Sequence, residues 1–210
     1  MNDKTIKIFK LIAFLIAFSG LIMTFIGHRI DFPQNSLPRS IALFFSFFTI
    51  WTNILLAVYF FITCFLPDSK LGVWSNKDFV KTALLLYIIF VGAGFHFLLS
   101  MVEFKGIRLW GSNILHYMNP ILMLIDWLLS KPTTKIKFKH TVLWLLFGIA
   151  YDIFALIKGS LTGFYPYPFF DVGDLGIIRV LINILGFSCG FLILGNLLAT
   201  ISNYRLKIAK

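Results

Sequence analysis

Six long stretches of apolar residues, separated by short polar loops, constrain this chain more than any other feature. A hydrocarbon core about 30 Å thick takes about 20 residues of α-helix to cross. The six runs approach or exceed that length, and they lack the alternation of polar and apolar residues that membrane β-barrels need. The predicted fold is therefore all-α: a polytopic bundle of six transmembrane helices forming a single domain over residues 1–210. The predicted spans are residues 9–27, 41–66, 82–102, 109–129, 141–157 and 180–204.

The composition supports lipid as the main solvent of this chain. Hydrophobic residues make up 59% and charged residues 13%, against about 45–50% and about 25% in soluble domains. A soluble domain of this size could not bury that much apolar surface, which excludes a soluble enzyme or a disordered tail. The two cysteines, Cys64 and Cys189, lie within apolar runs and fit no metal-ligand spacing, so we expect no metal site and interpret them as small core residues.

Lysine and arginine side chains gather in alternate loops. The N-terminus, the second and fourth loops and the C-terminus hold 13 of them, whereas the other loops hold 6. Because cytoplasmic loops carry the excess of positive charge, this asymmetry predicts that both termini are cytoplasmic. The same placement argues against a nucleic-acid partner, although the net charge is +10.

Four polar side chains from four different runs are predicted to lie at nearly the same depth in the outer leaflet. At 1.5 Å of rise per residue, Thr49 lies roughly 13 Å below the outer end of its run. His96, His116 and Asp152 each lie roughly 9 Å below the outer end of theirs. Since such groups are costly in hydrocarbon, each is a functional candidate.

Further polar residues share helix faces with the members of this group. Thr52 and Asn53 follow Thr49 by three and four residues, and Asn119 follows His116 by three. Residues at these spacings lie on one side of a helix. We therefore expect Thr52, Asn53 and Asn119 to be supporting or substrate-binding residues.

Two other features concern helix packing. Asp126 lies near the inner end of the fourth run, and we interpret it as an interfacial or helix-packing group. Small residues allow helices in a membrane to approach closely. Gly92 and Gly94 in the third run, and the GxxxG pair of Gly186 and Gly190 in the sixth, are predicted to do so within the chain.

A threonine and a histidine at one depth can perform nucleophilic chemistry. A hydroxyl is a weak nucleophile until a base takes its proton, and histidine suits that task because its ordinary pKa is near neutrality. Tyr151 or Asp152 is a candidate for the third group that fixes the tautomer of the ring. The alternative is structural, with Thr49 bonded to its own helix and His116 bridging two helices.

The fifth loop is rich in aromatic residues and contains two prolines. Tyr165, Tyr167 and Phe169 alternate with Pro166 and Pro168. The prolines forbid a regular helix, and aromatic side chains favour the headgroup level of the membrane. We expect either a lid over the polar group or an interfacial belt with no gating role.

Three motifs, taken in order, resemble a known family. They are FTIWTN at 48–53, HYMNPI at 116–121 and YPYPF at 165–169. The chain resembles the androgen-induced/androgen-dependent membrane proteins and, most closely, their bacterial six-pass "Pr-six-Pr" relatives. Eukaryotic members of that family are threonine hydrolases that cleave esters of fatty acids with hydroxy fatty acids.

The resemblance implies that Thr49 is the nucleophile and His116 the catalytic histidine, and that the chain lies in a bacterial cytoplasmic membrane. The chain departs from the family pattern in having Thr52 three residues after Thr49, where Asn or Asp is usual. That departure leaves Thr52 as an alternative nucleophile.

These observations lead to two functional hypotheses. The first is an intramembrane lipid-ester hydrolase with a threonine nucleophile and a histidine base in an outer-leaflet pocket, which needs no cofactor. Its partners would be membrane lipids or a lipid-like substrate, and a monomer is favoured. The alternative is a non-enzymatic membrane protein or carrier that binds a lipid or small molecule.

Overall fold

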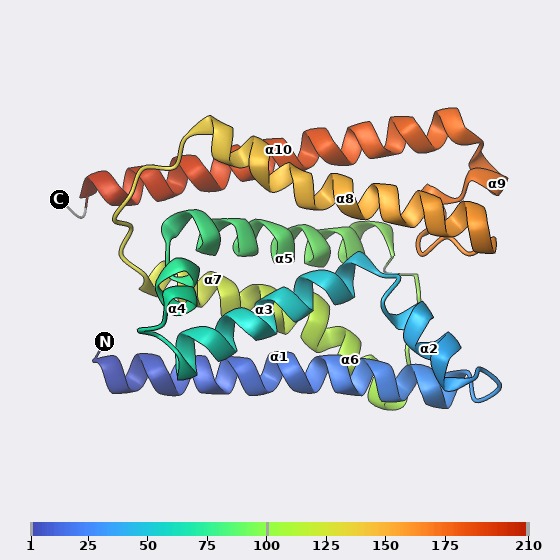
Figure 1. The fold of residues 1–210 in the computed structure, drawn as a ribbon, viewed down its shortest axis with the longest axis horizontal. Coiled ribbons are helices and arrows are strands. Elements are labelled where there is room, and N and C mark those ends of the chain that lie inside the picture. The colour runs from blue at the N-terminus through green and yellow to red at the C-terminus, as the bar shows by residue number, and fades with distance from the viewer. Residues whose placement is uncertain (1, 100, 209–210) are drawn as a thin grey trace. The chain divides into compact units, whose positions relative to one another are not determined.

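The computed structural model describes residues 2–99 and 101–208, and every regular element in these ranges is a helix. The chain divides into two compact units, Met1–Thr134 (unit 1) and Lys135–Lys210 (unit 2). Figure 1 shows the elements and their order along the chain.

Unit 1 holds the first eight elements. They are α1 (Asp3–Asp31), α2 (Leu37–Phe44), α3 (Phe48–Phe65), α4 (Lys70–Ser75), α5 (Asp78–Leu98), α6 (Gly106–Asn113), the π-helix η1 (Ile114–Met118) and α7 (Asn119–Leu129). In Figure 1, α1 and α5 run in one direction, while α3 and the α6–η1–α7 segment run in the other. The start of α3 therefore lies at the same end of unit 1 as the end of α5.

Unit 2 is built on two long helices. Its elements are α8 (Phe138–Thr162), the 3-10 turn η2 (Pro168–Phe170), α9 (Val172–Leu175) and α10 (Ile177–Ile208). Helices α8 and α10 lie antiparallel to each other (Figure 1). Between them, Thr141 Oγ1 lies 3.4 Å from Asn196 Oδ1. The Asn203 side chain of α10 also makes two hydrogen bonds, of 2.8 and 2.9 Å, with the backbone of Ile136, which precedes α8.

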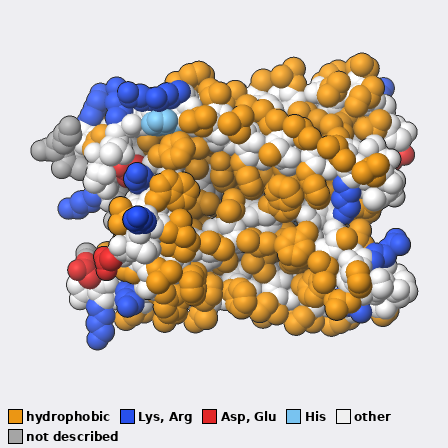
Figure 2. All heavy atoms as spheres, viewed as in Figure 1, with side chains coloured by type: hydrophobic (Ala, Val, Ile, Leu, Met, Phe, Trp, Pro, Cys, Tyr) orange, Lys and Arg blue, Asp and Glu red, His pale blue; other side chains and the backbone are white. Residues whose placement is uncertain are grey.

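Five helices of the described chain, α1, α3, α5, α8 and α10, are long and apolar enough to cross a membrane. On the face shown in Figure 2 the middle of the surface is mostly hydrophobic, and most of the visible Lys and Arg side chains lie toward its two ends.

Two predicted spans are interrupted. The second run divides into α2 and α3 at Ser46, whose hydroxyl donates to the Ala42 carbonyl at 2.6 Å, and Phe47 is extended. The fourth run consists of α6, η1 and α7, with 8, 5 and 11 residues in direct succession.

Small residues on one face of α1 let the helices of unit 1 approach closely. Ala13 and Ala17 are fully buried. A Cβ atom added at Gly20 would lie 2.5 Å from Cγ2 of Ile114. Residues at these spacings share a helix face, and small side chains on such a face are typical of packed membrane helices. The face of α1 thereby holds α3 and the start of η1 in place.

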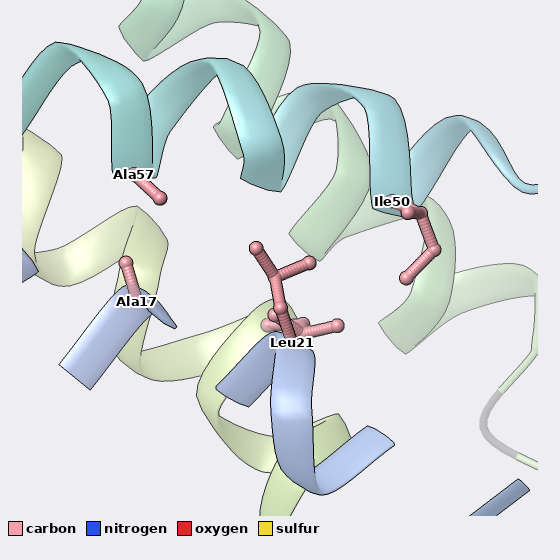
Figure 3. Close-up of a cluster of buried hydrophobic side chains, with 5 residues drawn as sticks. Ala17, Leu21, Ile50 and Ala57 are labelled. Atoms are coloured by element: carbon pink, nitrogen blue, oxygen red, sulfur yellow. The ribbon is translucent and has the colours of Figure 1, made fainter. Parts of the chain in front are cut away.

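The core beside this face contains the chain neighbours of two candidate residues. Ala17 and Leu21 of α1 pack with Ile50 and Ala57 of α3 and with Leu115 of η1 (Figure 3). Ile50 directly follows Thr49, and Leu115 directly precedes His116. Core packing therefore fixes the backbone on which Thr49 and His116 are mounted.

Candidate active site

Thr49 and His116 meet within unit 1. Thr49 lies in the first turn of α3, and His116 lies at the middle of η1. The Thr49 hydroxyl is 3.4 Å from Nε2 of the His116 ring. Contacts between a nucleophile and its base are often this long without substrate and tighten in the reacting complex.

The π-helix around His116 follows from Pro120. Proline has no N–H, and its ring collides with the carbonyl four residues earlier, which here belongs to His116. The chain accommodates this with a π-turn, in which the Asn119 N–H donates to the carbonyl of Ile114, five residues back. Such turns are frequent at functional sites because they re-aim side chains.

The hydrogen bonds of the His116 ring define its tautomer. Nδ1 lies 2.9 Å from the backbone carbonyl oxygen of Ser112 and 3.1 Å from the Ser112 hydroxyl. A carbonyl oxygen only accepts, so Nδ1 of the neutral ring carries the proton and donates it to this oxygen. Nε2 is then left with its lone pair facing Thr49, so the Thr49 hydroxyl is the donor. This is the arrangement that a general base requires.

Helix α5 contacts His116 on two sides. The Phe95 ring stacks on the imidazole, with centroids 3.9 Å apart and planes inclined by 16°. One turn earlier, a Cβ atom added at Gly92 would lie 2.6 Å from the His116 carbonyl oxygen. Glycine at position 92 therefore permits the approach that brings Phe95 onto the ring. Gly94, by contrast, has no neighbouring atom within 4 Å of an added Cβ among the described residues.

Asn53 and Asn119 form a second contact between α3 and α7, one turn from Thr49 and His116. Asn119 Nδ2 donates to Asn53 Oδ1 at 2.6 Å, and both side chains are fully buried. Thr52 lies beside them, but its hydroxyl contacts its own helix, at 3.1 Å from the Phe48 carbonyl and 3.0 Å from the Thr49 carbonyl.

The second predicted histidine has a different partner. His96 is exposed at the end of α5, and its Nδ1 lies 3.5 Å from the Tyr117 hydroxyl. Although it flanks Phe95 in sequence, it is not part of the hydrogen-bonded group that joins Thr49, His116 and Ser112 in the described chain.

Asp152 and the aromatic loop belong to unit 2. Asp152 is half-buried on α8, next to the buried Tyr151. In the loop, the rings of Tyr167 and Phe169 stack with centroids 5.1 Å apart, and Tyr165 packs where a side chain at Gly159 would otherwise lie. The loop is thus folded onto its own unit. The roles predicted for Asp152 and for a lid stay predictions.

A second polar cluster, the Asp126 cluster, lies near the opposite end of unit 1. The Tyr59 hydroxyl donates to Asp126 Oδ2, and Lys10 and Lys81 are close enough to interact with the same carboxylate. Lys81 donates to the Ser130 hydroxyl at 2.7 Å. Tyr59 follows Thr49 by ten residues on α3, so the two clusters are separated by roughly 15 Å along that helix.

Sequence reasoning missed three residues that surround His116. Ser112 precedes His116 by four residues, a spacing that places both on one helix face and could have identified it. Gly92 was recognised only as a packing residue, and no sequence signal marked Phe95. No group of three His, Cys, Asp or Glu side chains able to hold a metal occurs in the part of the chain that the structure describes.

The fold defines an all-helical protein with several helices suited to a membrane. Comparison with known protein families, with characterised proteins and with solved structures gave no match.

Proposed function

We propose that this chain is a six-pass membrane hydrolase of lipid esters, with Thr49 as nucleophile and His116 as general base. The observation that carries the proposal is the 3.4 Å contact between the Thr49 hydroxyl and Nε2 of His116, together with the Nδ1 contact to the Ser112 carbonyl. The family resemblance of the 48–53 and 116–121 motifs supports the same two residues.

The chemistry proceeds through an acyl-enzyme. Thr49 Oγ1 attacks the ester carbonyl while Nε2 of His116 takes its proton. His116 then gives this proton to the departing alkoxide, which leaves as an alcohol, and the acyl group stays on Thr49. Water attacks this second ester with His116 again as base, which releases a carboxylic acid and restores the Thr49 hydroxyl.

Two neighbours stabilise His116 while it is protonated. The hydrogen bond from Nδ1 to the Ser112 carbonyl becomes charge-assisted and therefore stronger. The face of Phe95 offers a favourable contact to the cationic ring. Neither residue needs to move, because both already contact the neutral ring.

Labelling with a fluorophosphonate, which reacts with activated hydroxyls, tests the nucleophile in isolated membranes. We expect the wild-type chain to be labelled, Thr49→Ala to lose the label and Thr49→Ser to keep it. Thr52→Ala is the matched control, because Thr52 lies one turn away and its hydroxyl is bonded to its own helix. Absence of label on folded wild-type protein would contradict the hydrolase and favour a lipid-binding carrier. Label that persists in Thr49→Ala and is lost in Thr52→Ala would overturn Thr49 as the nucleophile and assign that role to Thr52.

The six-pass topology with cytoplasmic termini is part of the proposal. The lysine and arginine distribution supports it, and so does the direct succession of α6, η1 and α7 across the fourth apolar run. A membrane-impermeant maleimide should modify Ser36→Cys from outside intact cells but not Ser69→Cys, in a background with both native cysteines replaced by alanine. The reverse pattern would overturn the orientation.

A further inference from the structure

The side chain of Asn53 joins the backbones that carry Thr49 and His116. Its Nδ2 lies 2.8 Å from the carbonyl oxygen of Thr49 and 3.4 Å from that of Leu115, the residue before His116. The first contact is within α3, and the second crosses to the π-helix. One amide group thus spans the two segments that hold the proposed nucleophile and base.

The π-turn explains why the Leu115 carbonyl accepts a side-chain donor. In an α-helix this oxygen would accept from the N–H of Asn119, but that N–H donates to Ile114. In a continued π-helix it would accept from residue 120, which is a proline and has no N–H. Buried carbonyls are rarely left without a donor, and the Asn53 amide is placed to supply one.

The orientation of both amides follows from these contacts. The NH₂ group of Asn53 must face the two carbonyls, which only accept, so its Oδ1 faces Asn119. Asn119 must then donate from its Nδ2, which lies 2.6 Å from Asn53 Oδ1. Both N–H bonds of Asn53 Nδ2 are directed to carbonyls, and the side chain is fully buried. Neither is therefore available to an oxyanion.

We propose that Asn53 and Asn119 are positioning residues, which set the register of α3 against η1 and α7 so that the Thr49 hydroxyl meets Nε2 of His116. This inference rests on the proposed hydrolase function and adds to it the device that assembles the reactive pair. The Asn53 contact is specific to this level of the bundle, because it uses the Leu115 carbonyl, which lacks a backbone donor only because of the π-turn.

Asparagine-to-leucine variants separate positioning from stability. Asn53→Leu or Asn119→Leu alone leaves a buried polar partner unsatisfied and lowers the melting temperature. The double variant removes both partners of the amide–amide contact, so we expect its melting temperature to exceed that of Asn53→Leu, in which the Asn119 amide is left without its acceptor. The double variant still lacks the contact between positions 53 and 119 that sets the register of the helices.

The decisive measurement is the rate of fluorophosphonate labelling as a function of probe concentration, per folded protein. A misplacement of about 1 Å can reduce the rate of a positioned reaction by about 100-fold. We expect the limiting labelling rate to fall by about 10- to 100-fold in both single variants and in the double variant. The probe concentration at half-maximal rate should stay within about twofold of wild type, since the residues do not touch the probe.

Asn196→Leu in unit 2 is the matched control. Asn196 also contacts a side chain of a neighbouring helix, Thr141, so its loss tests stability without touching the reactive pair. It should lower the melting temperature and leave the labelling rate unchanged.

Recovery of the labelling rate together with stability in the double variant would overturn the positioning role, while the hydrolase would stand. An unreactive wild-type protein would overturn both proposals, and the two failures are therefore distinguishable.

Discussion

The two polar clusters of unit 1 use similar residue types in different ways. Around His116 the groups are neutral, and the ring donates to a backbone carbonyl at one nitrogen while the other faces a hydroxyl. The Asp126 cluster instead contains acidic and basic side chains: the carboxylate accepts from Tyr59, and Lys10 and Lys81 interact with it electrostatically. A carboxylate that accepts from a tyrosine of a neighbouring helix holds helices together, whereas an imidazole that directs a lone pair at a hydroxyl can transfer a proton.

The largest effect is expected at His116. Loss of a general base reduces rates by about 100- to 10,000-fold. His116→Ala should therefore reduce fluorophosphonate labelling of Thr49 by at least about 100-fold. His96→Ala is the control and should label at the wild-type rate, because His96 contacts Tyr117 instead. Equal effects of the two variants would contradict the assignment of the base.

Asp126→Ala should act on stability. Asp126 is 3% exposed, and removing one member of a buried charged group costs about 3–5 kcal/mol of unfolding free energy. Denaturation in detergent should show this loss, while labelling per folded protein stays unchanged. Asp68→Ala, at an exposed loop position, should change stability by less than about 0.5 kcal/mol. A selective loss of labelling at full stability would show that the two clusters are not separate in function.

Gly92→Ala should affect both properties to an intermediate degree. The added Cβ would lie 2.6 Å from the His116 carbonyl oxygen, so α5 or η1 must shift. Overpacking of this kind costs about 1–3 kcal/mol, and we expect about a tenfold slower labelling because the imidazole moves with its backbone. Gly94→Ala, two residues away with open space around it, should label normally and unfold at or above the wild-type temperature.

Ser112→Ala should have the smallest effect. The substitution removes the hydroxyl at 3.1 Å but keeps the backbone carbonyl at 2.9 Å, which fixes the tautomer of His116. Labelling should fall by less than about threefold, and stability by about 1 kcal/mol or less. A loss of more than tenfold would mean that the hydroxyl, rather than the carbonyl, holds the ring.

Local sequence patterns predicted much of the helical architecture. Apolar runs at residues 9–27 and 180–204 lie within the longer helices α1 and α10, because hydropathy detects lipid-facing residues but not the polar turns that extend a helix beyond them. The breaks at Ser46 and at the π-turn were missed. Each of these two interruptions depends on which hydrogen-bond donor pairs with each backbone carbonyl, and hydropathy carries no information about that pairing.

The candidate site was predictable only in part. Counting residues from the ends of the runs brought Thr49 and His116 to one depth, and the structure places their side chains 3.4 Å apart. Depth alone could not show that Phe95 covers the ring, since that contact depends on helix rotation. The count of positive charges placed Lys10 with the N-terminus and Lys81 in the second loop. Both are buried and interact electrostatically with Asp126, which such a count could not show because it ignores where each side chain points.

The π-turn at 114–118 contains one more residue than an α-helical turn. This extra residue changes the direction in which the side chains after the turn point, relative to those before it. Each residue of an α-helix advances the chain by about 100° around the axis. Deleting one residue from this turn would rotate everything after it by about that angle, so that Asp126 could no longer face Tyr59 while His116 still faced Thr49. One inserted residue therefore lets a single pass through the bundle direct a proton acceptor at one end and a structural carboxylate at the other.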